Sequence, residues 1–420
     1  MVMKTLIFGA LASLAAAHAG HNHGEKYEQK NFVGETKEDL DAKWGTDWAF
    51  SGISTFAHLP HTRCLQNPDE EYDIAILGAP FDTAVTYRPG ARFGPRAIRA
   101  AAGRQTAFRG YNPRAAINPY QSWAKIIDCG DIPISPFDNA LALRQMTEAF
   151  TNLAHSTAPN QNVKSKIKYR NTPKLLALGG DHSTALPTLR ALNQIYGPVA
   201  VVHFDAHLDT WHPASYPSAW IDSSNPNEQS FFTHGTMFWV AHNGKKPQLS
   251  LIFRMDLPTN NQKESLIRKS SSVHAGLRTR LSGPEDNDDD TEQGWTRIAC
   301  DDIDDLGTKG VVEKILSVVG TEIPVYLSID IDVIDPGLAP GTGTPEPGGW
   351  TTRELIRVLR GIENLNVVGA DVVEVSPAYD GTGEATALAA AQIAFEILTS
   401  MVKKGLVGDE AATKKRRDEL

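Results

Sequence analysis

The chain has 420 residues, of which 41% are hydrophobic and 22% are charged, and its formal net charge is -9. This length and apolar content are enough to bury a large core, in one big domain or in two medium ones. The negative net charge argues against a nucleic-acid partner, since such proteins usually present a basic surface, and it modestly favours the approach of a small cationic substrate.

The N-terminal residues have the composition of a secretory signal peptide. Lys4 precedes an apolar stretch, residues 5–17, that is too short to span a bilayer, and the small residues of Ala17-His18-Ala19 follow it. We expect cleavage after Ala19, and an apolar N-terminus without a targeting role is the alternative. No later segment is predicted to be transmembrane, so we expect a mature chain without a membrane anchor.

From about Tyr72 onward, apolar strand-like runs alternate with helical patterns, which is typical of parallel βαβ units. The expected strands are Ile74–Gly78, Ile126–Asp131, Leu175–Leu178, Val199–Phe204, Val273–Leu277, Val325–Ile329 and Val367–Val375. The expected helices are Pro95–Ala102, Leu141–His155, Thr188–Ile195, Val311–Val319, Thr352–Ile362 and Ala387–Val402. The pattern predicts one large three-layer α/β/α domain with a mostly parallel central sheet.

Two polar segments interrupt this alternation. Residues Gly244–Ser272 are rich in Lys and Ser, and Gly283–Gln293 carries an acidic cluster, Glu285–Asp290. We interpret both as surface loops, because such runs bury too little apolar area to order themselves strongly. The acidic cluster lacks the spacing of a calcium-binding loop.

The cysteines and the C-terminal residues give information about the cellular compartment of the protein. Cys64, Cys129 and Cys300 allow at most one intramolecular disulfide, and Cys129, which follows an apolar run, is predicted to be a buried free thiol. Residues 417–420, Arg-Asp-Glu-Leu, differ only at the first position from the Lys-Asp-Glu-Leu signal for retention in the endoplasmic reticulum. A basic solvated tail is the alternative. We therefore expect entry into the secretory pathway, followed by secretion or by retention.

Three short blocks carry side chains that can bind metals. They are residues 179–183 (Gly-Gly-Asp-His-Ser), 205–209 (Asp-Ala-His-Leu-Asp) and 328–336 (Ser-Ile-Asp-Ile-Asp-Val-Ile-Asp-Pro). Because strand side chains alternate between two faces, the three ligands of the second block are expected to converge. All three blocks follow strand-like runs, and ligands collect outside the carboxyl ends of the strands in an open α/β sheet.

The candidate ligands are two imidazoles and four carboxylates: His182, Asp205, His207, Asp209, Asp330 and Asp332. This oxygen-rich set without thiolates suits manganese, with zinc, cobalt and iron as alternatives. Two ions about 3.5–4 Å apart can share a water and lower its pKa, so that hydroxide attacks an electrophilic carbon. The residues therefore predict metal-activated hydrolysis.

The combination of blocks resembles that of the ureohydrolase family, which comprises arginases, agmatinases and related manganese amidinohydrolases, from about Asp73 to Val402. The resemblance implies an arginase-like fold with two Mn²⁺ ions. It implies a homo-oligomer, since family members are commonly trimers or hexamers. Together with the composition of the two ends, it predicts a signal peptide (1–19), an N-terminal extension (20–70), a ureohydrolase catalytic domain (71–403) and a basic C-terminal tail (404–420).

The same resemblance gives the ligands their roles. It implies that His182, Asp205, Asp209 and Asp330 hold one ion, that His207, Asp205, Asp330 and Asp332 hold the other, and that Asp205 and Asp330 bridge. Asp209 would also orient the attacking hydroxide. Asp181 and Asp335 are interpreted as residues that support ligands or form turns. His203 is interpreted as a core histidine, with a place beneath the metals as the alternative.

Two further residues complete the predicted active site. His234, in Thr233–Phe238, resembles the family histidine that passes a proton to the departing amine; a loop histidine held by backbone hydrogen bonds is the alternative. Glu374, in Asp371–Pro377, matches the carboxylate that pairs with the substrate guanidinium, whose planar fork suits bidentate contact. A structural salt bridge is the alternative for Glu374.

The resemblance also narrows the substrate. Residues Phe81–Arg99 and His234–Thr236 resemble the agmatinase branch, and no match to the polar loop with which arginases bind a substrate carboxylate is found in His212–Phe232. The leading hypothesis is hydrolysis of agmatine to putrescine and urea. An ω-guanidino acid such as 4-guanidinobutyrate is the close alternative, and an Arg or Lys in the pocket would favour it. The third possibility is a metal-binding or guanidinium-binding protein without turnover.

Overall fold

The structure, a computed structural model, describes residues 36–45, 47–160, 171–213, 232–244 and 264–418. It divides the chain into two compact units, residues 1–48 and residues 49–420. The first unit contains helix α2 (Lys37–Trp44). The predicted leader lies outside the described residues. Residues 49–70 of the predicted extension belong to the second unit, where Phe56 is fully buried.

The second unit is built around a parallel sheet of eight strands in the order β2-β1-β3-β8-β7-β4-β5-β6. Their bounds are β1 Ile74–Ala79, β2 Ile126–Asp131, β3 Lys174–Gly179, β4 Ala200–Phe204, β5 Ser272–Leu277, β6 Trp295–Ala299, β7 Pro324–Asp330 and β8 Asn366–Val373. All seven pairs of neighbouring strands are parallel. Only β6 has no counterpart among the predicted strands.

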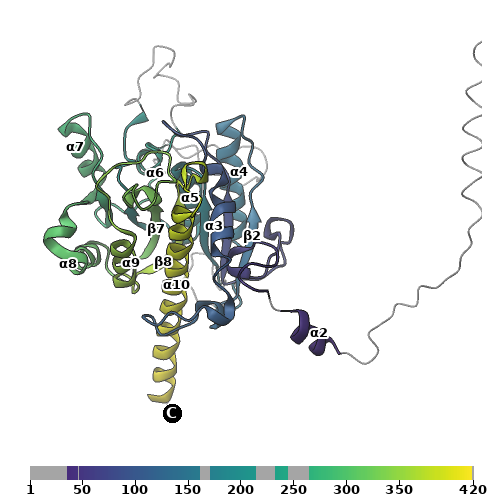
Figure 1. The fold of residues 1–420 in the computed structure, drawn as a ribbon. Helices are drawn as coiled ribbons and strands as arrows, with labels where there is room; N and C mark the ends of the chain where they lie inside the picture. The colour runs from purple at the N-terminus through teal and green to yellow at the C-terminus, as the bar shows by residue number, and fades with distance from the viewer. Residues whose placement is uncertain (1–35, 46, 161–170, 214–231, 245–263, 419–420) are drawn as a thin grey trace, which may run out of the picture. The chain divides into compact units, whose positions relative to one another are not determined.

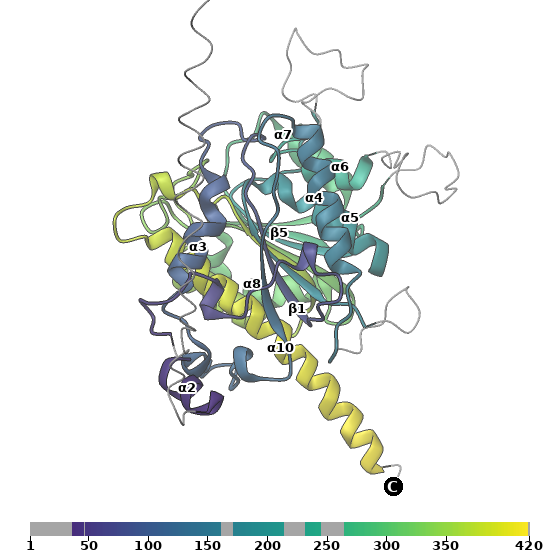
Figure 2. The ribbon, with the colours of Figure 1, turned by 90° about the vertical axis from the view of Figure 1, so that its right-hand side faces the viewer.

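Helices cover both faces of this sheet, which confirms the predicted three-layer α/β/α fold (Figures 1 and 2). One face packs against α3 (Gly94–Ala102), α8 (Asp302–Val319), α9 (Thr352–Gly361) and α10 (Ala385–Asp418). The other face packs against α4 (Asn139–Ala154), α5 (Ala185–Tyr196) and α6 (Met237–Asn243). The six predicted helices correspond to α3, α4, α5, α8, α9 and α10.

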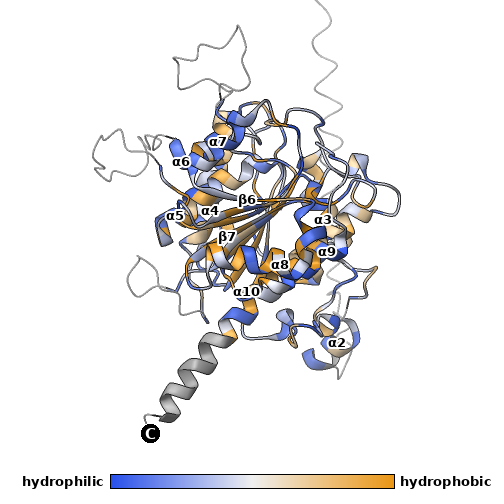
Figure 3. Cartoon of the chain, turned by 90° about the vertical axis from the view of Figure 1, so that its left-hand side faces the viewer, coloured by the Kyte–Doolittle hydropathy of each residue, from blue (hydrophilic) through white to orange (hydrophobic). Residues whose placement is uncertain are grey.

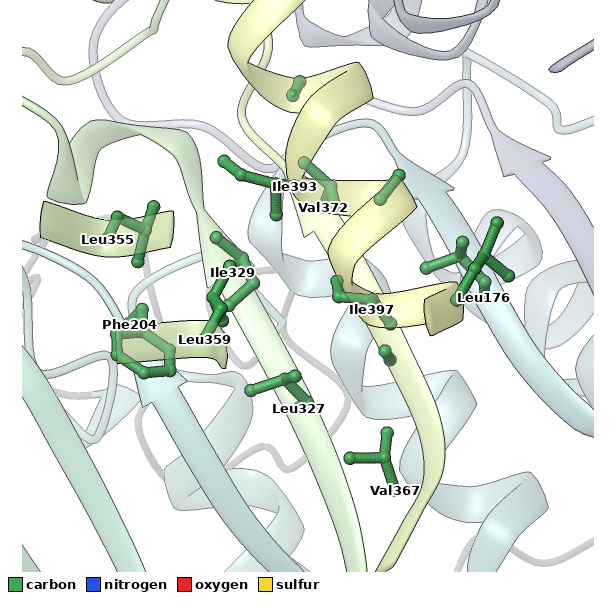
Figure 4. Packing of buried hydrophobic residues seen from close by; sticks show 14 of the residues in the cluster. Leu176, Phe204, Leu327, Ile329, Leu355, Leu359, Val367, Val372, Ile393 and Ile397 are labelled. Carbon is green, nitrogen blue, oxygen red and sulfur yellow. The ribbon is translucent and has the colours of Figure 1, made fainter. Parts of the chain in front are cut away.

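Alternate residues of each strand pack into the two helix layers. On β3, Leu176 belongs to the core beneath α10 and Leu175 to the core beneath α4 and α5. Figure 4 shows Ile393 and Ile397 of α10 beside Val372 of β8. Strands buried on both faces are expected to be largely apolar, as these are, although β4 and β5 each contain a buried histidine, His203 and His274. Full burial of each such Leu, Ile or Val contributes roughly 1.5–3 kcal/mol, so the sheet is a rigid base for the loops at its ends.

Helix α10 is apolar because it is a core helix. By length and composition its segment Ala385–Leu406 could cross a membrane, which was not expected from the sequence, but 78% of the most apolar window is buried in the protein. Figure 3 shows mostly hydrophobic strands in the middle of the molecule, between helices that carry both hydrophobic and hydrophilic residues. The helix continues to Asp418, through most of the predicted basic tail.

The prediction of a surface loop at Gly283–Gln293 is wrong, because Pro284–Gln293 forms helix α7. Pro284 lies at the first helical position, Glu285 and Asp286 occupy the first turn, and Gly294 ends the helix with a φ of +91°. Proline at the start, acidic residues near the positive end of the helix dipole and a left-handed glycine after the end are all favourable helix signals. The acidic run therefore lies in a helix, whose first turn Glu285 and Asp286 stabilise.

Two other predictions need correction. Cys129 is not a free thiol, since it forms a disulfide with Cys64 across a separation of 65 residues; Cys300 is free and buried. Of the predicted loop Gly244–Ser272, residues 245–263 lie outside the described residues. Its last part is not a solvated loop, because buried Glu264 pairs with Arg190 at 2.6 Å.

Candidate metal centre and active site

The candidate site lies at the carboxyl ends of four strands in the middle of the sheet. Strands β3, β8, β7 and β4 are neighbours in that order. His182 follows β3, Glu374 follows β8, Asp330 ends β7 and Asp205 follows β4. Because all four strands are parallel, their ends meet at one edge of the sheet, where α/β proteins bind ligands.

A close turn after β3 positions His182. A Cβ atom at Gly180 would overlap the carbonyl oxygen of Phe81, so only glycine lets the two backbone segments approach there. The carboxylate of Asp181 accepts hydrogen bonds from the backbone N–H groups of Ser183 (3.1 Å) and Ala84 (3.1 Å). Burial and the nearby charge of Glu374 raise the pKa of Asp181 to about 7. Asp181 thus holds the turn that presents His182.

The two ring nitrogens of His182 have different surroundings. Nδ1 lies 3.0 Å from Oδ2 of Asp205, 3.0 Å from Oδ2 of Asp209 and 3.4 Å from Oδ2 of Asp330. Nε2 lies 2.8 Å from Oγ of Ser328, and that hydroxyl donates to Asp371 at 2.8 Å. Since Ser328 gives its proton to Asp371, it accepts one from Nε2–H of His182. This leaves the Nδ1 lone pair for a metal ion.

The residues after β4 converge, although not by the strand alternation that was predicted. β4 ends at Phe204, and Asp209 has a left-handed backbone with a φ of +56°. Oδ1 of Asp205 accepts a hydrogen bond from the backbone N–H of His207 at 2.6 Å. A turn organised by Asp205, and not a continuing strand, therefore directs these side chains inward.

Asp205 lies between the two candidate ligand histidines. Its Oδ2 faces His182, while its Oδ1 lies 3.1 Å from Nδ1 of His207. The same nitrogen of His207 lies 3.0 Å from Oδ2 of Asp332, and Oδ1 of Asp330 accepts from the backbone N–H of Asp332 at 2.8 Å. One carboxylate oxygen toward each histidine is the arrangement that a bridging ligand requires.

These donors fit divalent metal ions. Two groups of side chains bring their ligand atoms within 4.8 Å of one another: His182, His203, Asp205 and Asp209, and Asp205, His207 and Asp332. Burial and the charges of Asp332 and Asp205 raise the pKa of Asp330 well above its usual value, and burial and Asp205 raise the pKa of Asp332 to about 6. Divalent cations would relieve this repulsion between buried carboxylates.

His234 and Glu374 are brought together beside the metal ligands. Nδ1 of His234 lies 3.1 Å from Oε1 of Glu374, and this oxygen also accepts from the backbone N–H of His182 at 2.9 Å. Nε2 of His234 accepts from the backbone N–H of Thr86 at 3.0 Å. Burial opposes the charged ring, but the hydrogen bond and charge of Glu374 raise the pKa of His234. The ring is thus oriented by a carboxylate, as a proton-transferring histidine requires.

Glu374 has a free oxygen directed at no described group. Among the described residues, Oε2 of Glu374 is buried and has no hydrogen-bond partner, and the residue has a φ of +60°. A buried acceptor without a donor costs about 1–3 kcal/mol, and strained backbone clusters at functional sites. A guanidinium N–H group would satisfy this oxygen, which argues against a purely structural salt bridge for Glu374.

A pocket of about 250 Å³ opens onto this centre. Its inner part includes His207, Asp209, His234 and Asp330, and its outer part includes Trp211, Arg280 and Asp286. Arg280 follows β5 and is exposed, whereas Asp286 lies in the first turn of α7. The pocket thus joins the metal ligands to an outer wall that carries both signs of charge.

Several residues of the site have no local sequence signal. Thr86, Arg280 and Asp286 reach the site only through the fold, since they lie on loops or helices far from the three blocks in sequence. Asp335, by contrast, accepts hydrogen bonds from the backbone N–H groups of Gly337 and Gly348, each at 2.8 Å, and so organises a turn. The segment His212–Phe232, in which no arginase loop was found, lies mostly outside the described residues.

A sequence profile of the arginase family matches residues 72–399. The chain belongs to the arginase family. It is 41% identical to "Putative agmatinase 1" of Schizosaccharomyces pombe over 99% of this chain and 100% of that protein. It is 35% identical to the proclavaminate amidinohydrolase of Streptomyces clavuligerus over 83% of this chain and 93% of that one.

The solved structure of the proclavaminate amidinohydrolase from S. clavuligerus has a TM-score of 0.68 and 33% identity, and the match covers 85% of this chain and 100% of that one. The predicted resemblance to ureohydrolases of the agmatinase branch, and the arginase-like fold that it implies, are thereby confirmed.

Proposed function

We propose that this arginase-family protein is a two-metal hydrolase that cleaves a guanidino compound and releases urea. The observation that carries the proposal is the position of Asp205 between His182 and His207, beside the unpartnered oxygen of Glu374. Such a site combines a place for two cations with an acceptor for a guanidinium group.

The residues of the site supply binding, orientation and proton transfer. When bound, the two metal ions would lower the pKa of a shared water and so provide the nucleophile. Glu374 accepts guanidinium N–H groups and directs the central carbon toward Asp209, whose carboxylate orients the attacking oxygen. The water oxygen bonds to that carbon, the bond between the carbon and the alkyl-substituted nitrogen breaks, and His234 passes a proton released by the water to this nitrogen. One water is consumed, and urea and a primary amine are released.

Agmatine is the leading substrate, with putrescine and urea as products. Relatives named as agmatinases include the S. pombe protein and one from Enterobacter sp. (strain 638), which is 36% identical over 83% of this chain and 94% of its own length. Asp286 in the outer pocket could accept the ammonium group of agmatine. Of its two oxygens, only Oδ2 has a hydrogen bond within the described part of the chain, from the backbone N–H of Ser282 at 2.7 Å.

The second candidate is an ω-guanidino acid such as 4-guanidinobutyrate, and Arg280 favours it. The Arg280 side chain lines the same pocket, is exposed, and forms no ion pair with any residue that the structure describes. A guanidinium in that position suits bidentate contact with a substrate carboxylate. The outer wall therefore has an acidic residue, Asp286, for the ammonium group of agmatine and a basic residue, Arg280, for the carboxylate of 4-guanidinobutyrate.

Urea release separates these candidates. Protein without its leader, loaded with Mn²⁺, is given agmatine, 4-guanidinobutyrate and arginine in parallel, and kcat/KM is measured for each. Asp286→Asn should selectively impair agmatine turnover if the amine is bound at Asp286, and Arg280→Ala should selectively impair 4-guanidinobutyrate turnover if the acid is the substrate. No urea from any of the three would favour a binding protein without turnover.

Manganese, a homo-oligomer and the secretory pathway are part of the same proposal. The oxygen-rich ligand set supports manganese, and the composition of residues 1–19 supports entry into the secretory pathway. The Cys64–Cys129 disulfide is consistent with an oxidising compartment. Secretion by cells that express the full chain, compared with a variant lacking residues 417–420, would distinguish retention from secretion, and light scattering would give the oligomeric state.

A further inference from the structure

A chain of buried hydrogen bonds leads away from Asp205 of the candidate metal centre. Nε2 of His203 lies 2.9 Å from Oδ2 of Asp205, and Nδ1 of His203 lies 2.7 Å from Nδ1 of His274. Nε2 of His274 lies 3.1 Å from Oδ1 of Asp290. His203, His274 and Asp290 are each fully buried and come from β4, β5 and α7. The chain thus joins β4, β5 and α7 through their side chains.

The far end of the chain is anchored firmly. Oδ2 of Asp290 pairs with Arg297 of β6 at 2.6 Å, and Oδ1 accepts from the hydroxyl of Thr210 at 2.8 Å. The backbone carbonyl of Thr210 accepts from the side chain of Gln293 at 3.0 Å. Helix α7 is therefore tied to the residue that follows the ligand Asp209.

The direction of these hydrogen bonds follows from the groups at the ends. An ionised carboxylate can only accept, so Asp205 receives Nε2–H of His203 and Asp290 receives Nε2–H of His274. Between the two Nδ1 atoms, one ring donates and the other accepts, so the donating ring carries a proton on both of its nitrogens. Each ring is also fixed by packing, since His274 stacks on Trp295 with centroids 4.0 Å apart. The chain can hold Oδ2 of Asp205 in one direction.

We propose that His274 is a positioning residue for the metal centre. Anchored by Asp290, it fixes the ring of His203, which in turn fixes the carboxylate of Asp205 between His182 and His207. Hydrogen bonds from outside to ligand carboxylates and imidazoles set the direction of their lone pairs, and their loss typically weakens metal binding by about 10–100-fold. This inference rests on the proposed function only in assigning metal ions to the site.

The test measures metal affinity directly. His274→Phe retains an aromatic ring against Trp295 but has no hydrogen-bonding nitrogen, whereas His274→Gln keeps an amide group that can hydrogen-bond with both His203 and Asp290. Mn²⁺ dissociation constants of the metal-free proteins are measured by calorimetric titration. His274→Phe is expected to bind Mn²⁺ about 10–100-fold more weakly than the wild type, and His274→Gln is expected to recover part of the loss.

Two further variants complete the design. His155→Phe is the matched control, because His155 lies at the end of α4 and its Nδ1 contacts only the backbone carbonyl of Thr151, at 2.7 Å, in the described structure. It should bind Mn²⁺ as the wild type does. If metal-free His274→Phe fails to fold, as judged by its melting temperature, Asp290→Asn carries the test by weakening the anchor and should also lower Mn²⁺ affinity.

The outcomes separate this inference from the proposed function. Unchanged Mn²⁺ affinity in folded His274→Phe, or equal losses in His274→Phe and His274→Gln, would overturn the positioning role. A wild type that binds two Mn²⁺ ions but releases no urea would refute the proposed function alone, and the dissociation constants of the variants would still decide the role of His274. A wild type that binds no Mn²⁺ would refute both.

Discussion

Replacement of Glu374 by Gln tests how the substrate is held. Oε1 of Glu374 accepts hydrogen bonds from the backbone of His182 at 2.9 Å and from His234 at 3.1 Å, and an amide oxygen can keep both. Oε2 changes from a charged acceptor to an N–H donor, and the loss of charge also removes a cause that raises the pKa of His234. A hydrogen bond to a charged group contributes about 1.5–3 kcal/mol, so we expect kcat/KM to fall by about 10–150-fold.

The assay is steady-state urea release with the preferred substrate, together with metal content and melting temperature. Because Glu374 lies in neither of the two ligand groups, Glu374→Gln should retain wild-type metal content. Glu374→Asp is a second variant. Its shorter side chain keeps the negative charge but places it farther from the substrate, so this variant should also lose activity. Wild-type kcat/KM in folded, metal-loaded Glu374→Gln would refute the assignment of Oε2 to guanidinium binding.

Three other perturbations test other parts of the structure. Asp332→Ala removes the carboxylate 3.0 Å from His207 and should lower metal content from two ions toward one and impair urea release; full turnover would contradict its role as a ligand. Burial, with a smaller contribution from Lys404, lowers the pKa of Lys174 from 10.5 to about 8. The unfolded state therefore binds the proton more tightly, and wild-type stability should rise by about 3 kcal/mol between these pH values. Lys174→Met should lose this pH dependence and melt at a higher temperature than the wild type at pH 7. Lys125→Met, at an exposed site, is the control and should keep both the pH dependence and the melting temperature of the wild type. The double substitution Cys64→Ser and Cys129→Ser opens a loop of 65 residues and should lower the free energy of unfolding by up to about 4 kcal/mol in urea denaturation, with Mn²⁺ affinity unchanged.

The sequence predicted the parts of the fold whose signals are local. Buried central strands such as β3 and β7 are mostly apolar and were located to within a residue at each end. The edge strand β6 has the sequence Trp-Thr-Arg-Ile-Ala, is only partly buried and directly follows α7. Its alternation of apolar and polar residues is therefore too short to be recognised in the sequence. Helix α7 was misread because acidic composition outweighed its proline start and glycine end.

The residues of the candidate site likewise divide into those with a local sequence signal and those without one. Its metal ligands stand in short blocks after strands, where type and spacing are visible along the chain. Residues such as His274, Arg280 and Thr86 gain their meaning only from contacts between elements far apart in sequence. The Cys64–Cys129 pairing likewise depends on where the fold brings β2 and the segment before β1 together. Tertiary proximity of this kind has no periodic signal in one sequence.

The central claim is that the six residues of the three blocks hold two metal ions. Crystals of the protein lacking residues 1–19, grown with Mn²⁺ and measured at the manganese absorption edge, test it most directly. We expect two anomalous peaks per chain, one beside His182 and one beside His207, with Asp205 contacting both. A single peak, or manganese bound elsewhere while these residues pair only with one another, would contradict the two-metal centre.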